Sequence, residues 1–336
     1  MENMQPLVTI ITPCYNMENK IKPYLDSVIK QTYKNVELIL VDDGSVDKTK
    51  DIIKDYIPVI ESKGYTVKYI YKENGGAASA VRTGLDYVNG KYLMWPDADD
   101  ILMDNSIESK VNYLESHPEY AFVRTNAYVI PSDNLSDRSR LVVKHKNLKR
   151  RKIYNECIRF KTFYCPGCYM VRWKDFLKAN PEKYIYSTYF GQNIQMLLPL
   201  AYKFECGYID EPQYGYIVYK DSHSHLGGKQ TFERKMEYSY NIEKIMLDTL
   251  KHIEGIKASD FKKIKNDFSV RRTILAYNSG DNTAKIKEYN NIAGIRKFNP
   301  ILLFVRYGKK NKVTDKLIEF YNNCDILIFQ ILNWRK

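Results

Sequence analysis

The chain has no long apolar run. None of its apolar stretches reaches the roughly 18 residues that a membrane-spanning helix needs. Residues 1–6 lead directly into a short apolar segment, without the basic and apolar regions that make up a signal peptide. We therefore expect a cytoplasmic protein with reduced thiols. Peripheral attachment to the inner face of the membrane is compatible with this expectation.

Cysteine is scarce, with six residues among 336, and one pair, Cys165 and Cys168, has Cys-x-x-Cys spacing. A zinc site built on such pairs needs a second pair, and the chain has none. The next residues, 169–173, have the pattern of a strand. These observations favour structural cysteines over redox chemistry.

Acidic residues are fewer than basic ones. The chain has 40 Asp and Glu and 52 Lys and Arg, which gives a net charge of +12. This charge suits nucleotide diphosphates, nucleic acid or an anionic membrane surface. Residues 144–152 contain six Lys or Arg, and such runs are more often solvated loops than polyanion sites. Because no nucleic-acid-binding motif is evident, we expect no nucleic-acid partner.

The first third of the chain alternates strand and helix patterns. Strand patterns cover residues 7–11, 36–41, 67–71 and 92–95, and helical patterns cover 19–31, 47–60 and 77–88. Strands separated by helices of this length predict βαβ units and a parallel sheet. Further strand patterns follow at 120–124 and 127–130, and mixed patterns continue to about residue 228.

Three polar segments follow three of the predicted strands. Residues 12–16 follow the first strand, 41–45 end the second, and Asp97, Asp99 and Asp100 come directly after residues 92–95. Ligands of open α/β sheets bind at the carboxyl ends of the strands, where these segments would meet. Alternating carboxylates suit a hard divalent cation, although an Asp-rich helix-capping turn is the competing interpretation. Together the three segments favour a nucleotide site with a metal.

At these motifs the chain resembles the family 2 glycosyltransferases with the GT-A fold. The matching segments are Pro13-Cys14-Tyr15-Asn16, Val41-Asp42-Asp43-Gly44-Ser45, Asn74-Gly75-Gly76 to Gly84, and Asp97-Ala98-Asp99-Asp100. The resemblance implies an α/β, Rossmann-like nucleotide-sugar-binding domain with a mostly parallel sheet over residues 1–228. Its donor-binding half would cover 1–115 and its acceptor-side half 116–228, followed by a helical region, 229–336.

The resemblance also implies the site residues. The nucleotide-sugar site would consist of Thr12, Pro13, Tyr15, Asp42, Asp43, Gly75, Gly76, Arg82, Asp97 and Ala98. Asp97 and Asp99 would hold Mn²⁺ or Mg²⁺, with His223 or His225 as a further candidate ligand. Arg82 either contacts the diphosphate or lies on an exposed helix face.

The catalytic base is the weak point of the resemblance. An inverting transferase needs a carboxylate to take the proton from the acceptor hydroxyl, and relatives supply it from a Glu-Asp pair at a helix start. Gln192 and Asn193 stand at the corresponding place, and amides cannot act as bases. Three explanations stay open: another acid serves, the site positions the acceptor without a conventional base, or the protein is inactive. The candidate acids are Asp210, Glu211 and Asp221.

The region after residue 230 has a helical pattern rich in Lys, Ile, Leu and Tyr. Residues 315–321 and 326–332 carry more apolar side chains than one helix face needs. Packing against a second subunit, which would make a homo-oligomer, is the first interpretation. Lying on an anionic membrane is the second.

The predicted function is metal-dependent transfer of a hexose, with inversion, from a UDP-sugar to a glycan acceptor. The acceptor would be a cell-surface polysaccharide, a lipid-linked glycan or a glycoprotein. A sugar nucleotidyltransferase is disfavoured because residues 12–16 lack a Gly-rich, basic phosphate loop. A non-catalytic, transferase-like partner protein stays open because of Gln192 and Asn193.

Overall fold

The computed structural model describes residues 5–142, 146–159, 162–219, 231–294, 300–307 and 316. The chain divides into two compact units. The first consists of Met1–His225 with Asp248–Glu254, and the second of Leu226–Leu247 with Gly255–Lys336. Among the described residues, no helix is both long enough and apolar enough to cross a bilayer.

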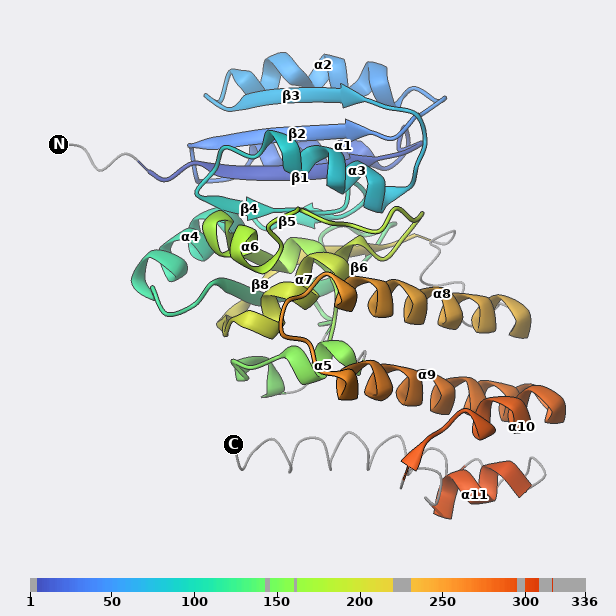
Figure 1. Cartoon of the computed structure of the whole chain (residues 1–336). Helices are drawn as coiled ribbons and strands as arrows, with labels where there is room; N and C mark the ends of the chain where they lie inside the picture. Colours follow the sequence, from blue (N-terminus) through green and yellow to red (C-terminus); the bar gives the residue numbers. More distant parts are fainter. Residues whose placement is uncertain are drawn as a thin grey trace. The chain divides into compact units, whose positions relative to one another are not determined.

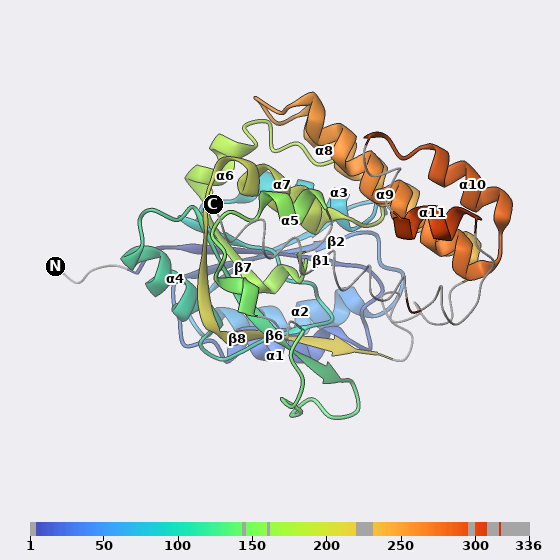
Figure 2. The same ribbon diagram turned by 90° about the horizontal axis from the view of Figure 1, so that it is seen from below.

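The first unit begins with the predicted βαβ units. Figure 1 shows four parallel strands side by side, in the order β3-β2-β1-β4. Their bounds are β1 Val8–Cys14, β2 Val36–Asp42, β3 Thr66–Tyr71 and β4 Tyr92–Met94. Helices α1 (Ile21–Ile29) and α2 (Thr49–Glu61) cover one face, and α3 (Ala77–Gly84) covers the other (Figure 2).

Burial explains the patterns of these strands. Every residue of β1 is buried, as expected for a central strand with helices on both faces. Edge strand β3 has no fully buried residue and alternates exposed with half-buried positions over its first half. The sequence therefore predicts the parallel half of the sheet closely, with element bounds within a few residues.

The sheet continues with strands of both directions, in the overall order β3-β2-β1-β4-β7-β6-β8-β5. Strand β7 runs antiparallel to β4 and β6, whereas β6 and β8 are parallel to each other. The elements are β5 Ile101–Leu102, α4 Ser106–Ser116, β6 Phe122–Pro131, α5 Tyr154–Ile158, β7 Tyr169–Arg172, α6 Trp173–Ala179, α7 Gln192–Lys203 and β8 Cys206–Val218, with short 3₁₀ turns at Leu85–Tyr87, Lys146–Lys149 and Pro166–Cys168.

Two predicted strand segments, 120–124 and 127–130, form the single strand β6. The pairing of β6 with β8 shifts register between Arg124 and Ala127, which is the signature of a β-bulge. The bulge lies at the polar residues Thr125 and Asn126, which are buried between the two apolar segments, so that one continuous strand looks like two in the sequence.

The described residues of the second unit are mainly helical, as predicted. Its helices are α8 (Phe232–Lys251, of which residues 232–247 belong to this unit), α9 (Ala258–Ser279), α10 (Asn282–Asn290) and α11 (Pro300–Tyr307). One apolar cluster joins α9, α10 and α11 through Val270, Tyr289, Ile292 and Leu302. The apolar segments 315–321 and 326–332 lie outside the described residues, apart from Lys316.

Candidate active site

The loops after β1 and β2 lie together at one edge of the parallel sheet. Cys14 pairs with Asp42 in the strand register, and the Asp43 amide donates to the Cys14 carbonyl at 2.8 Å. Asn16, which has a positive φ of 50°, accepts from the Val46 amide at 3.0 Å. The side chain of Tyr15 is 45% exposed, so its ring is accessible to a ligand at this edge.

Asp42 and Asp43 are both buried and bind other parts of the protein. Asp42 accepts from the Ser45 amide at 2.8 Å and the Tyr69 hydroxyl at 2.6 Å. Asp43 accepts from Lys72 Nζ at 2.6 Å and from the two glycine amides that precede α3. Asp43 therefore joins the second loop to the Gly-rich segment, and the amides of Gly75 and Gly76 already have a carboxylate partner.

Gly76 lets the acceptor-side half approach the donor-binding half. Its φ is +87°, and a Cβ there would lie 2.3 Å from Tyr189 Cα and 2.4 Å from the Thr188 carbonyl oxygen. Only glycine fits this position without displacing the backbone of residues 188–189.

The acidic cluster divides into two parts with different surroundings. Asp97 and Asp99 are half-buried, whereas Asp100 is buried. Asp100 accepts from the Tyr214 hydroxyl at 2.7 Å and the Ile217 amide at 2.8 Å, both in β8. Burial, with the charges of Asp99 and Asp97, raises the pKa of Asp100 well above its usual range. Asp100 is therefore a structural link to β8, which leaves Asp97 and Asp99 as the candidate ligand-binding pair.

Burial and the charge of Asp99 raise the pKa of Asp97 to about 7. A cation would offset the mutual repulsion of these carboxylates. Among the described residues no group of three or more His, Cys, Asp and Glu could hold a metal ion. Two carboxylates completed by substrate phosphates and water are a usual arrangement for Mg²⁺, so the donor set fits. His223 and His225 lie outside the described residues.

The start of α7 reaches the acidic cluster. Gln192 is 8% exposed, and its Nε2 donates to Asp97 Oδ1 at 3.3 Å. The first turn of α7 contains no acidic residue. Asn193 Oδ1 is buried and has no hydrogen-bond partner among the described residues. The predicted position of the catalytic base therefore adjoins the metal-binding candidates, and it carries amides in place of acids.

Several other candidates lie in different surroundings. Arg82 is half-buried on α3 and pairs with Asp86 at 2.7 Å, and its contact with the diphosphate stays a prediction. Asp210 is exposed and lies 3.4 Å from Lys149 Nζ, and Glu211 accepts from Gln213 at 3.2 Å. The third candidate acid, Asp221, lies outside the described residues.

The Cys-x-x-Cys pair has the surroundings of structural cysteines. A hydrogen bond with Cys168, together with burial, raises the pKa of Cys165 well above its usual range. A reactive thiol needs the opposite shift, because the thiolate is the nucleophile. Cys168 is fully buried at the end of the 3₁₀ turn that leads into β7.

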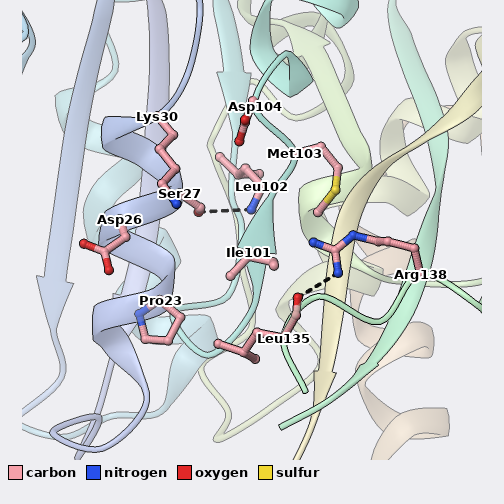
Figure 3. A pocket seen from close by; sticks show the side chains of 10 residues that line it. All are labelled: Pro23, Asp26, Ser27, Lys30, Ile101, Leu102, Met103, Asp104, Leu135 and Arg138. Carbon is pink, nitrogen blue, oxygen red and sulfur yellow. Dashed lines mark hydrogen bonds between the residues drawn. The ribbon is translucent and has the colours of Figure 1, made fainter. Parts of the chain in front are cut away.

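A cavity of about 270 Å³ lies beside α1 and β5. Figure 3 shows its lining side chains, which come from α1, from β5 and the residues after it, and from residues 135–138. The set is Pro23, Asp26, Ser27, Lys30, Ile101, Leu102, Met103, Asp104, Leu135 and Arg138. None of the sequence-predicted site residues is among them.

Sequence reasoning missed two contributors to the site edge. Lys72 follows directly after β3, so the rule that strand ends gather at one edge could have identified it. Tyr69 is different, because it lies within β3 and its hydrogen bond to Asp42 depends on the pairing of β2 with β3. No local signal in the sequence indicates that contact.

Comparison with known proteins identifies the family. The sequence model described as Glycosyl transferase family 2 matches residues 9–180, which is half of the chain. An uncharacterized glycosyltransferase of Rickettsia prowazekii is 44% identical over 109 residues, 32% of each chain. The minor teichoic acid biosynthesis protein GgaB of Bacillus subtilis is 35% identical over 111 residues, 32% of this chain and 12% of that protein. These matches span a third or less of the curated relatives.

Solved structures show the same fold over most of the chain. Staphylococcus aureus TarS 1–349 in complex with UDP-GlcNAc has a TM-score of 0.59 at 16% identity, covering 89% of this chain and 87% of that one. The mannosyltransferase PcManGT of Pyrobaculum calidifontis, in complex with GDP-Man and Mn²⁺, has a TM-score of 0.54 at 14% identity, covering 97% and 81%. The predicted GT-A-type fold is confirmed, and the chain belongs to glycosyl transferase family 2.

Proposed function

We propose that the enzyme transfers a hexose from a UDP-sugar to a glycan acceptor with the help of Mn²⁺ or Mg²⁺. The observation that carries this proposal is the half-buried pair Asp97 and Asp99 on the loop after β4. The structural neighbour TarS binds UDP-GlcNAc, and PcManGT binds GDP-Man with Mn²⁺. The first supports a UDP-sugar, and the second supports a metal and keeps a GDP-sugar as the alternative donor.

Different residues at the edge of the sheet bind different parts of the donor. The accessible ring of Tyr15 stacks on the base, and the loop that carries Asp42 encloses it. Asp97 and Asp99 would hold the cation. When bound, the cation supplies Lewis-acid chemistry, since it offsets the charge that develops on the departing nucleoside diphosphate.

The acceptor meets the donor at the start of α7. A buried oxygen without a partner costs about 1–3 kcal/mol, so Asn193 Oδ1 is suited to accept from a substrate hydroxyl. We propose a cell-surface glycan as the acceptor, because one relative is a teichoic acid biosynthesis protein. We further propose that the hexose is transferred with inversion of configuration, and that the reaction takes place in the cytoplasm or at the inner face of the membrane.

A screen of nucleotide sugars tests this function. UDP-hexoses are expected to raise the melting temperature and to be hydrolysed slowly in the presence of Mn²⁺, whereas chelation of the metal abolishes both effects. GDP- and TDP-sugars serve as matched alternatives. Equal thermal shifts with and without Mn²⁺, or no shift with any nucleotide sugar, would contradict the proposal.

A further inference from the structure

Gln192 is the point at which the acceptor-side helix meets the acidic pair. It is the first residue of α7, it is 8% exposed, and its Nε2 donates to Asp97 Oδ1. The hydrogen bond joins residues 95 positions apart in the chain, so it is a tertiary contact between the two halves of the domain.

The donor that reaches the Asp97 carboxylate is neutral. Asp97 is half-buried and has a second carboxylate, Asp99, two residues further along the chain. The Gln192 amide donates a hydrogen bond to Asp97 without adding charge. Helix α7 is 12 residues long, begins at Gln192 and has no acid in its first turn, so its positive end is not neutralised there. An acid at this position would instead add a third negative charge beside the pair.

The segment before α7 is held on two sides, which fixes the position of Gln192. Gln195 Oε1 accepts from the Tyr186 amide at 2.6 Å, and Gln195 Nε2 donates to the Tyr186 carbonyl at 3.1 Å. On the other side, the backbone of Thr188 and Tyr189 packs directly on Gly76. A residue held in this way can orient a neighbour, because its own conformation is set by packing and hydrogen bonds.

We propose that Gln192 is a positioning residue of the metal site, which orients the Asp97 carboxylate for the cation through a neutral hydrogen bond. This inference rests on the proposed function. On this inference, Gln192 supports the metal site, and its presence at the expected position of the base does not by itself mean that the enzyme is inactive. Hydrogen-bond partners of metal ligands commonly contribute about 10–100-fold to metal affinity or activity.

The test compares Gln192→Met with Gln213→Met. Both variants remove a buried amide that donates to a carboxylate, but the carboxylate that Gln213 binds is Glu211 and not one of the acidic pair. Binding of Mn²⁺ in the presence of UDP is measured by the electron paramagnetic resonance signal of the free ion. We expect Gln192→Met to weaken binding at least about tenfold and Gln213→Met to leave it unchanged.

Activity gives a second, independent measurement. For Gln192→Met, the Mn²⁺ concentration for half-maximal UDP-sugar hydrolysis should rise by a similar factor, while kcat returns toward the wild-type value at excess Mn²⁺. A merely structural defect would not be rescued by the metal. Gln192→Glu should lower hydrolysis, and a gain of activity in this variant would identify a missing base and overturn the inference.

The outcomes separate this inference from the function on which it rests. Absence of Mn²⁺ and UDP binding in the wild-type protein would overturn the proposed function. Normal binding in the wild type, with equal affinity in Gln192→Met, would overturn only the positioning role.

Discussion

Neighbouring side chains in the acidic cluster perform different tasks. Asp99 is half-buried beside Asp97, whereas Asp100 is buried and binds the Tyr214 hydroxyl and the Ile217 amide of β8. Sequence alone presents three similar acids in four positions. The surroundings of Asp100 are decided by its contacts with Tyr214 and Ile217 of β8, which lie 114 and 117 residues further along the chain.

At the residue scale, we expect Asp99→Asn to abolish Mn²⁺-dependent binding and hydrolysis of a UDP-sugar, because an amide is a poor ligand for a hard cation. Asp100→Asn is the matched control. An Asn side chain can accept from the Ile217 amide and donate to the Tyr214 hydroxyl oxygen, so this variant should retain metal binding and lose about 1 kcal/mol of stability. Calorimetric titration with Mn²⁺ and UDP, together with urea denaturation, checks both. Full metal binding by Asp99→Asn would remove Asp99 from the metal site.

At the scale of elements, the contact between the turn before α3 and the segment before α7 depends on Gly76. Gly76→Ala introduces a Cβ 2.3 Å from Tyr189 Cα, whereas Gly64→Ala, at the same φ of +87°, meets no atom within 4 Å. Both variants place alanine at a positive φ, but only Gly76→Ala adds the steric overlap, and the ψ of 163° at Gly76 adds backbone strain of its own.

We expect Gly64→Ala to cost about 1–2 kcal/mol through its left-handed backbone. Gly76→Ala should cost roughly 1–3 kcal/mol more, through displacement of residues 188–189. UDP-sugar hydrolysis should fall only in Gly76→Ala, because that variant moves the start of α7. Urea denaturation and a hydrolysis assay measure the two effects. Equal behaviour of the variants would mean that the close approach has no consequence for the site.

Helix α4 carries a buried lysine whose charge depends on pH. Lys110 is fully buried, and its Nζ donates to Ser106 Oγ at 2.6 Å. Burial lowers the pKa of Lys110 from 10.5 to about 7. Between these values the unfolded chain binds more protons than the folded chain, so this group makes stability rise with pH from about 7 to 10.5.

Replacement of the lysine should remove this dependence. Relative to Lys110→Met, the wild-type protein should gain roughly 2–5 kcal/mol of unfolding free energy between about pH 6 and pH 10. Below pH 7 the variant should be the more stable protein, since the wild type then buries a charge. Urea denaturation across this range checks the prediction, with the exposed Lys54→Met as control. Parallel profiles for wild type and Lys110→Met would contradict it.

At the scale of the whole molecule, charge is divided unequally between the two units. The second unit contains 21 Lys and Arg against 10 Asp and Glu, so it carries +11 of the net +12. Two copies of such a unit repel each other at low ionic strength, and an anionic surface attracts it. The charge therefore bears directly on the two interpretations of the C-terminal region.

The structure shows where the chain can be truncated to test whether its C-terminal region forms a homo-oligomer or binds a membrane. Leu302 is buried in the apolar cluster of α9, α10 and α11, so removal of α11 would open that core. Deletion of residues 308–336 removes none of the four residues that form this cluster. If the chain forms a homo-oligomer through this tail, light scattering should show a mass that rises with salt for the full chain and stays monomeric for the deletion.

An unchanged mass after this deletion would contradict assembly through the tail. Sedimentation with anionic vesicles would then examine the membrane interpretation, with neutral vesicles as control. Binding that disappears as salt is raised is expected for electrostatic attachment, because the Debye length falls to about 3 Å at 1 M salt.

The sequence by itself determined the alternation of strands and helices and the edge of the sheet where the site lies. Both follow from local patterns, since apolar periodicity sets the elements and parallel strands bring their carboxyl ends to one edge. Only the tertiary structure decided which polar groups bind one another. Asp43 binds Lys72 and the Gly-rich turn, Asp100 binds β8, and Gln192 binds Asp97. These contacts join distant segments, and the direction of each side chain depends on packing that no local pattern records.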